Sequence, residues 1–169
     1  MEKGKSIFIR HTDARSIIQS YSRIAWIYDI WARLTESKAA REVIELAEIH
    51  DGQRILEVAV GTGFVFAEIL RQNKNGETFG VDIAPDMLTR ADRRVRYTQN
   101  GHFHLQIASS YRLPFDSNSF DLLINNFMFK LLPEEDFPVA LREFHRVLKP
   151  GGILVLSTMT FGERWYNDI

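Results

Sequence analysis

The stretch RILEVAVGTG, residues 54–63, decides the fold. Its first seven residues are mostly apolar and partly β-branched, which is typical of a strand buried on both faces of a parallel sheet. Gly61 and Gly63 follow at once, and glycine lets a backbone turn sharply or approach a ligand without a Cβ in the way. A buried strand that enters a glycine turn and then a helical pattern predicts the first unit of an α/β protein.

The same alternation of strand and helix continues downstream. Helical patterns cover residues 64–71, 85–97 and 133–148, and strand patterns cover residues 78–82, 102–108, 120–126 and 153–159. Strands joined by right-handed helical crossovers lie parallel in one sheet with helices on both faces. We therefore predict a doubly wound α/β fold, preceded by two N-terminal helices over residues 14–34 and 37–49.

Composition limits the class of protein further. A chain of 169 residues with 45% hydrophobic residues suits one domain, with residues 1–50 as a helical cap and residues 51–169 as a ligand-binding core. The net charge of -1 offers no general attraction to nucleic acid or anionic membranes. The sequence has no cysteine, no secretory signal and no apolar run of membrane-spanning length. We expect a cytoplasmic protein with neither a transmembrane segment nor a nucleic-acid partner.

A candidate ligand site follows from the spacing of the strand ends. In doubly wound sheets, ligands bind at the carboxyl ends of the strands. Asp82 ends the second strand, 19 residues after Gly63, where a carboxylate can accept both hydroxyls of an adenosine ribose. Phe66 stands where a dinucleotide fingerprint has its third glycine, and no nucleoside-triphosphate loop occurs. The pattern favours an adenosine ligand without a pyrophosphate and leaves a nicotinamide-dependent oxidoreductase as a weaker alternative.

Four segments resemble the class I S-adenosylmethionine-dependent methyltransferases, especially the branch with the ubiquinone and menaquinone C-methyltransferases. They are ILEVAVGTG (55–63), GVDIAPDML (80–88), LPFDSNSFD (113–121) and HRVLKPGGILVLS (145–157). The resemblance implies a Rossmann-like sheet in the order 3-2-1-4-5 and S-adenosyl-L-methionine as cofactor. It also implies two further antiparallel strands, 6 and 7, which are absent from the sequence. We therefore expect either a C-terminally truncated chain or a five-strand version of the fold.

The resemblance also assigns residues to the cofactor site: Tyr28, Glu57, Ala59, Gly61, Thr62, Gly63, Asp82, Ile83, Met87, Ser109, Ser110 and Asn125. In this assignment Gly61 and Gly63 face the methionine part, and Asp82 holds the ribose hydroxyls. The other residues after the second and third strands surround the adenine. Asn125 begins the floor beneath the transferable methyl group, and Tyr28 covers the cofactor from the N-terminal helix.

The implied activity is methyl transfer to a small or amphiphilic acceptor, such as a quinone, a lipid or a metabolite. Such a transfer needs alignment and exclusion of water and has no obligatory protein nucleophile, so no catalytic residue is assigned. Asn125 is followed by Asn126 and Phe127, unlike the Asn-Pro-Pro-aromatic or Asp-Pro-Pro-aromatic motif of enzymes that methylate amino groups of DNA bases. The alternative is a regulatory module that binds the adenosyl cofactor without turnover.

Two further expectations concern metals and assembly. His102 and His104 lie two residues apart in a strand, but no third ligand accompanies them, so no metal site is expected. The fifth strand is apolar and lies at an edge of the sheet in the family order. An open apolar edge favours pairing with another chain, so a homodimer through the fifth strand is a possible assembly.

Overall fold

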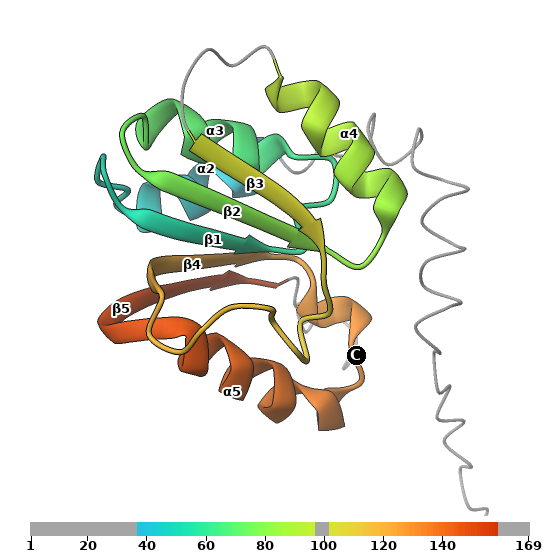
Figure 1. The fold of residues 1–169 in the computed structure, drawn as a ribbon. Coiled ribbons are helices and arrows are strands. Elements are labelled where there is room, and N and C mark those ends of the chain that lie inside the picture. The colour runs from blue at the N-terminus through green and yellow to red at the C-terminus, as the bar shows by residue number, and fades with distance from the viewer. Residues whose placement is uncertain (1–36, 97–101, 159–169) are drawn as a thin grey trace, which may run out of the picture.

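A computed structural model describes residues 37–96 and 102–158 (Figure 1). Five strands, all parallel, form one sheet in the order β3-β2-β1-β4-β5. The strands are β1 (Arg54–Val58), β2 (Glu77–Asp82), β3 (His102–Ile107), β4 (Phe120–Asn126) and β5 (Leu148–Ser157). The predicted fold class and strand order are confirmed. Within the described residues, β5 is the last strand and no antiparallel strand lies beside it.

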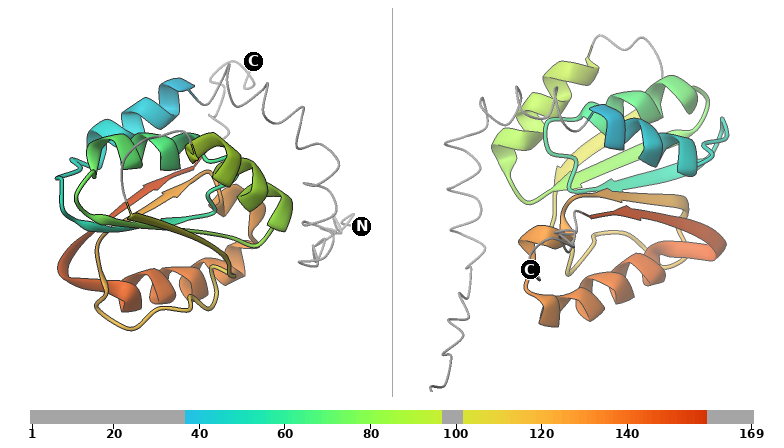
Figure 2. Two further views of the ribbon diagram at one scale, coloured as in Figure 1. Left: turned by 45° about the horizontal axis from the view of Figure 1, so that its top comes forward. Right: turned by 180° about the vertical axis from the view of Figure 1, so that it is seen from behind.

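Helices cover both faces of this sheet. Helices α2, α3 and α4 lie on one face and α5 lies on the other, as Figures 1 and 2 show from three directions. Their bounds are α2 (Ser37–Leu46), α3 (Phe64–Gln72), α4 (Pro85–Val95) and α5 (Phe137–Val147). Of the two helices predicted before the first strand, the second corresponds to α2. The first, over residues 14–34 and including Tyr28, lies outside the described residues.

The central strand β1 explains why its sequence is apolar almost throughout. It pairs with β2 on one side and with β4 on the other. Leu56 packs into the core beneath α5, whereas Ile55 packs against α2 and α3, and both are fully buried. A strand covered on both faces needs apolar side chains at successive positions, because neither face meets water.

Two element boundaries differ from the prediction by four residues or more. The helix predicted from residue 133 begins at Phe137, after two 3-10 turns, η2 (Phe129–Leu131) and η3 (Glu134–Asp136). Pro138 lies in its first turn, where a residue without an N–H leaves no intrahelical bond unmade. The fifth strand begins at Leu148, not at residue 153, because the segment with Pro150 continues alongside β4, with a register irregularity between residues 120 and 122.

The strand β5 forms an edge of the sheet. Within the described residues it pairs with β4 alone, and its Ile153, Leu154 and Leu156 are exposed. Unpaired backbone groups beside apolar side chains favour association with another strand. A homodimer through this edge stays a prediction, which light scattering at several protein concentrations would test. No helix in the described ranges combines the length and apolar character needed to cross a membrane.

Candidate cofactor site

A cavity of about 250 Å³ lies at the carboxyl ends of the strands, between the halves of the sheet. This is the point where the strand order reverses, the usual ligand position in a doubly wound sheet. The predicted site residues that line it are Glu57, Ala59, Gly61, Thr62, Asp82, Ile83, Met87, Ser109 and Ser110. The topology therefore brings residues from three strand ends, far apart in the sequence, around one space.

Asp82 joins two of these strand ends. Its Oδ2 accepts the N–H of Gly61 at 2.8 Å, and its Oδ1 accepts the N–H of Ala84 at 2.9 Å. Burial raises the pKa of this carboxyl group, whereas hydrogen bonds from the backbone of Ala84, Gly61 and Ile83 lower it. Each carboxylate oxygen has a second lone pair, so Asp82 can fix the turn after β1 and still accept hydrogen bonds from a ligand.

The two glycines of the turn, Gly61 and Gly63, have different structural roles. Gly61 lines the cavity with φ +54°, and a Cβ built there would meet nothing within 4 Å. Gly63 has φ +79°, but a Cβ there would lie 2.7 Å from the Cα of Ala91 in α4. Gly61 thus leaves open space at the cavity, and Gly63 allows α3 to begin in contact with α4. Gly63 is not among the residues that line the cavity.

Two other cavity residues adopt a backbone conformation that side chains with a Cβ rarely accept. Ala59 has φ +64° and Phe127 has φ +57°. The N–H groups of both Ala59 and Val60 donate to the carbonyl oxygen of Val81, at 2.8 and 3.1 Å, and these bonds hold the chain in this turn. Strained non-glycine residues persist where the surrounding structure over-determines them, typically at ligand sites.

Glu57 brings an unpartnered carboxylate oxygen to the cavity. Its side chain is only 1% exposed, and its Oε2 has no hydrogen-bond partner within the described part of the chain. Burial raises the pKa of Glu57 well above its ordinary value, and the nearby charge of Asp82 raises it further. An orphaned acceptor at a cavity wall suits a cationic group on a ligand, such as the ammonium group of S-adenosylmethionine.

Asn125 lies behind the cavity wall. It is fully buried in β4, and its Nδ2 donates to the carbonyl oxygen of Val58 at 2.8 Å, so the side chain ties β4 to β1. The residues that form the wall at this point are the next three, Asn126, Phe127 and Met128. At the end of β4 the cavity wall thus begins one residue after Asn125, and a role of Asn125 at the cofactor stays a prediction.

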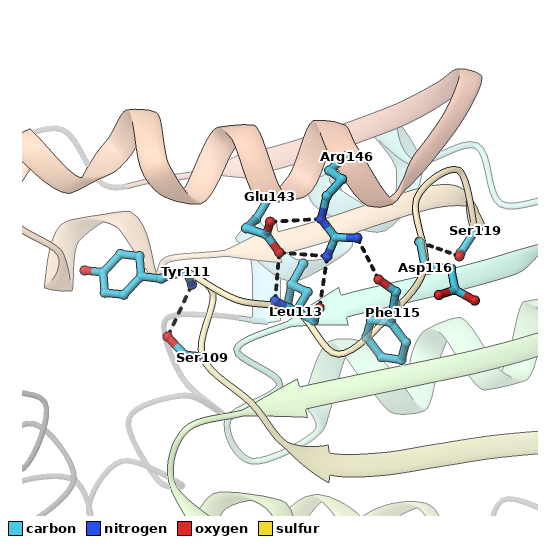
Figure 3. Close-up of polar contacts among 8 residues, drawn as sticks. All are labelled: Ser109, Tyr111, Leu113, Phe115, Asp116, Ser119, Glu143 and Arg146. Atoms are coloured by element: carbon cyan, nitrogen blue, oxygen red, sulfur yellow. Dashed lines mark hydrogen bonds and ion pairs between the residues drawn. The ribbon is translucent and has the colours of Figure 1, made fainter.

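The loop that carries Ser109 and Ser110 is fastened to α5 (Figure 3). Arg146 donates to the carbonyl oxygens of Leu113 and Phe115, at 2.9 and 2.7 Å. Glu143 pairs with Arg146 at 2.8 Å and also accepts the N–H of Leu113 at 2.9 Å. Because this ion pair holds three backbone groups of the loop, it positions the two serines at the cavity.

We expect Arg146→Ala to lower the free energy of unfolding by about 1.5 to 2.5 kcal/mol, since it removes charge-assisted bonds to two carbonyl groups. Urea unfolding of the variant measures this loss. Arg142→Ala is the matched control, because Arg142 is exposed on the same helix. Equal stability of the two variants would contradict an anchoring role for Arg146.

A polar pair on the far wall of the cavity was not predicted from the sequence. The hydroxyl of Tyr111 donates to Oδ2 of Asp136 at 2.8 Å, and both residues line the cavity. Burial and the hydrogen bond to Asp136 raise the pKa of Tyr111 to about 12, so its hydroxyl remains a donor at neutral pH. Apolar residues complete this wall: Phe127, Met128, Leu131, Leu132 and Pro133.

A family profile described as a methyltransferase domain matches residues 55–152, which contain the glycine turn, Asp82 and β4. The chain belongs to the class I S-adenosylmethionine-dependent methyltransferase family. The resemblance seen in the four sequence segments is thereby confirmed. The members of this methyltransferase family use S-adenosylmethionine. This molecule is therefore the candidate ligand for the carboxylates and glycines described above.

Two curated methyltransferases illustrate the relationship. The malonyl-[acyl-carrier protein] O-methyltransferase of Halorhodospira halophila is 33% identical over 159 residues, which cover 93% of this chain and 52% of the relative. The demethylmenaquinone methyltransferase of Geobacillus kaustophilus is 30% identical over 147 residues, covering 86% of this chain and 56% of the relative. The chain thus spans about half the length of these methyltransferases.

Solved structures share the methyltransferase fold. The [4+2]-cyclase SpnF has a TM-score of 0.74 at 22% identity, over 85% of this chain and 59% of the cyclase. A methyltransferase of Aquifex aeolicus that depends on S-adenosylmethionine has a TM-score of 0.60 at 22% identity, over 68% of this chain and 61% of that protein. Because the first of these is named a cyclase, the fold alone does not specify the reaction, and the function must be inferred from the residues of the site.

Proposed function

We propose that this chain binds S-adenosylmethionine in the cavity and transfers its methyl group to a small or amphiphilic acceptor. The observation that carries the proposal is the joint position of Glu57, Gly61 and Asp82 at one cavity that Phe127, Met128, Leu131, Leu132 and Pro133 also line. Two related enzymes are named for the malonyl group of acyl-carrier protein and for demethylmenaquinone. From these two enzymes we infer only the class of acceptor, which is small or amphiphilic.

The residues at the cavity suit the parts of this cofactor. Asp82 has spare acceptor capacity for the ribose hydroxyls, and the open space at Gly61 admits the methionine part close to the backbone. Ile83 and Met87 offer apolar contacts to the adenine, and the hydroxyls of Ser109 and Ser110 offer it hydrogen bonds. Gly63 and Asn125 do not line the cavity, and we place them behind its wall as structural supports.

The cofactor supplies a methyl group activated by a sulfonium. The chain then has to hold the acceptor in line with that group and keep water away. The apolar side chains of Met128, Leu131 and Leu132 exclude water from the acceptor side of the cavity. The Tyr111–Asp136 pair gives this wall a polar group that can orient a hydroxyl or amino group of an acceptor.

Calorimetry with S-adenosylmethionine, S-adenosylhomocysteine and NAD tests the ligand class. We expect both adenosyl ligands to bind and NAD to fail. Binding of NAD in their place would favour an oxidoreductase. Incubation with a labelled methyl donor and a metabolite extract then tests turnover. Tight binding without any labelled product would favour a regulatory module.

We expect Gly61→Val to abolish detectable S-adenosylmethionine binding, because the new side chain enters the space that the ligand needs. Calorimetry measures the binding, and circular dichroism checks the fold. Gly52→Val is the matched control: Gly52 also has positive φ and an open Cβ position, but it precedes β1 at the opposite end of the sheet. Both variants carry a similar backbone penalty, of about 1 to 2 kcal/mol. Intact binding by Gly61→Val would exclude the cavity as the cofactor site.

A further inference from the structure

The buried carboxyl groups of Glu57 and Asp82 lie at neighbouring strand ends, and they differ in how many hydrogen bonds they accept. Both oxygens of Asp82 accept a backbone N–H, whereas Oε2 of Glu57 has no partner within the described part of the chain. Two ionised carboxylates at neighbouring strand ends of a buried site repel each other, and a buried carboxylate oxygen without a hydrogen-bond partner adds a desolvation cost. A proton on one of the two groups relieves this repulsion, and Glu57 is better suited to hold it because its carboxyl group has fewer hydrogen bonds.

The neighbouring strands and helix provide little positive charge that could stabilise an ionised Glu57. The residues level with it are Gly80 on β2 and Ile124 on β4, and neither carries a charge. Helix α3 begins beside the cavity, and the basic residue of its last turn, Arg71, lies at the other end of the helix. The charge that acts on Glu57 is that of Asp82, which opposes ionisation.

The other titratable groups around the cavity lie elsewhere on its wall. Tyr111 and Asp136 form their pair on the opposite side. On α4, Arg94 donates to the hydroxyl of Thr62 at 3.0 Å, and its guanidinium group lies 5.9 Å from the centre of the Phe64 ring.

We propose that Glu57 is protonated in the ligand-free protein and ionises when the ammonium group of S-adenosylmethionine binds, so that cofactor binding releases a proton to solvent. The O–H bond of the Glu57 carboxyl group breaks, the proton passes to water, and the carboxylate accepts a hydrogen bond from the ammonium group. The neutral acid at the cavity wall thus becomes one half of an ion pair. The inference rests on the proposed function, since it requires that S-adenosylmethionine is the ligand.

The proposal also predicts how the affinity for S-adenosylmethionine changes with pH. Burial beside Asp82 raises the pKa of Glu57 in the free protein, and a bound cation lowers it. Binding therefore favours the ionised form, and affinity for S-adenosylmethionine rises with pH, by up to tenfold per pH unit below the free-protein pKa of Glu57. Above that pKa the affinity becomes level.

Calorimetric titration at pH 6.5 in buffers of different ionisation enthalpy counts the protons released, and at this pH the ammonium group of the ligand is itself fully protonated. Three ligands separate the possible causes: S-adenosylmethionine, S-adenosylhomocysteine, which keeps the ammonium group but lacks the sulfonium, and methylthioadenosine, which lacks both. We expect the first two to release protons and the third to release none. Release with S-adenosylmethionine alone would overturn the assignment to the ammonium group.

Variants at position 57 complete the test. Glu57→Gln should bind S-adenosylmethionine without proton release, and Glu57→Asp should retain the release because it keeps a titratable group. Undiminished release by a folded Glu57→Gln protein would overturn the inference. If the glutamine variant does not fold, the wild-type comparison with methylthioadenosine still decides the question. Failure of the wild type to bind S-adenosylmethionine would overturn the proposed function itself, whereas binding without proton release would overturn only this inference.

Discussion

Replacing Gly63 with alanine is expected to lower the free energy of unfolding by about 3 kcal/mol. The new Cβ would lie 2.7 Å from the Cα and 2.8 Å from the Cβ of Ala91, so α3 and α4 must move apart. Overpacking of this kind costs about 1 to 3 kcal/mol, and the left-handed backbone conformation adds about 1 to 2 kcal/mol. Urea unfolding followed by circular dichroism measures the loss.

Gly61→Ala is the control for this prediction. It has the same left-handed backbone, but its Cβ meets nothing within 4 Å, so we expect a loss of only about 1 kcal/mol. The difference between the two variants isolates the contact with Ala91. Equal losses would show that backbone conformation alone explains both glycines and would refute the packing role of Gly63.

Replacing Asp82 with alanine is expected to weaken S-adenosylmethionine binding by about 1.5 to 3 kcal/mol, or roughly 10- to 150-fold in Kd. The variant loses the acceptor proposed for the ribose hydroxyls. It also releases the N–H of Gly61, which Asp82 holds at 2.8 Å, so the turn beside the methionine part is less well fixed. Calorimetry measures the change in affinity.

Two further variants separate these contributions. Asp86→Ala removes an exposed acid from the first turn of α4 and should leave affinity unchanged. Asp82→Asn keeps one acceptor oxygen and should lose less affinity than Asp82→Ala. Wild-type affinity in the Asp82→Ala protein would exclude a ribose contact at this position.

The central fold was predictable because its signals are local. An apolar run such as residues 54–60 has few alternatives to a buried strand, and Asp82 falls at a distance from the turn that a single βα crossover dictates. The beginning of β5 was not predictable in this way. Pro150 and the glycines after it signal a turn when considered alone, and only pairing between Leu148 and Phe120 extends the strand through them.

The candidate site, too, was only partly predictable from the sequence. Residues directly after the first three strands were predicted to lie together, and they line one cavity. The Tyr111–Asp136 pair was missed because its members are 25 residues apart and meet only through the tertiary fold. The burial of Asn125 between β4 and β1 could not be predicted, because a sequence does not show which of two adjacent asparagines lines the cavity. Their cofactor contacts remain proposals for the binding experiments.

The central position of β1 has a consequence for the way this protein folds. The Asn125 side chain that joins β4 to β1 lies 67 residues beyond its partner, Val58. During synthesis from the N-terminus, β1 is therefore made long before its neighbour on that side and waits with one edge unpaired. Such long-range parallel pairing is slow and exposes the growing chain to aggregation. Because strand ends from both halves of the sheet line the cavity, a ligand that binds there stabilises only the completed sheet and favours the last step of folding.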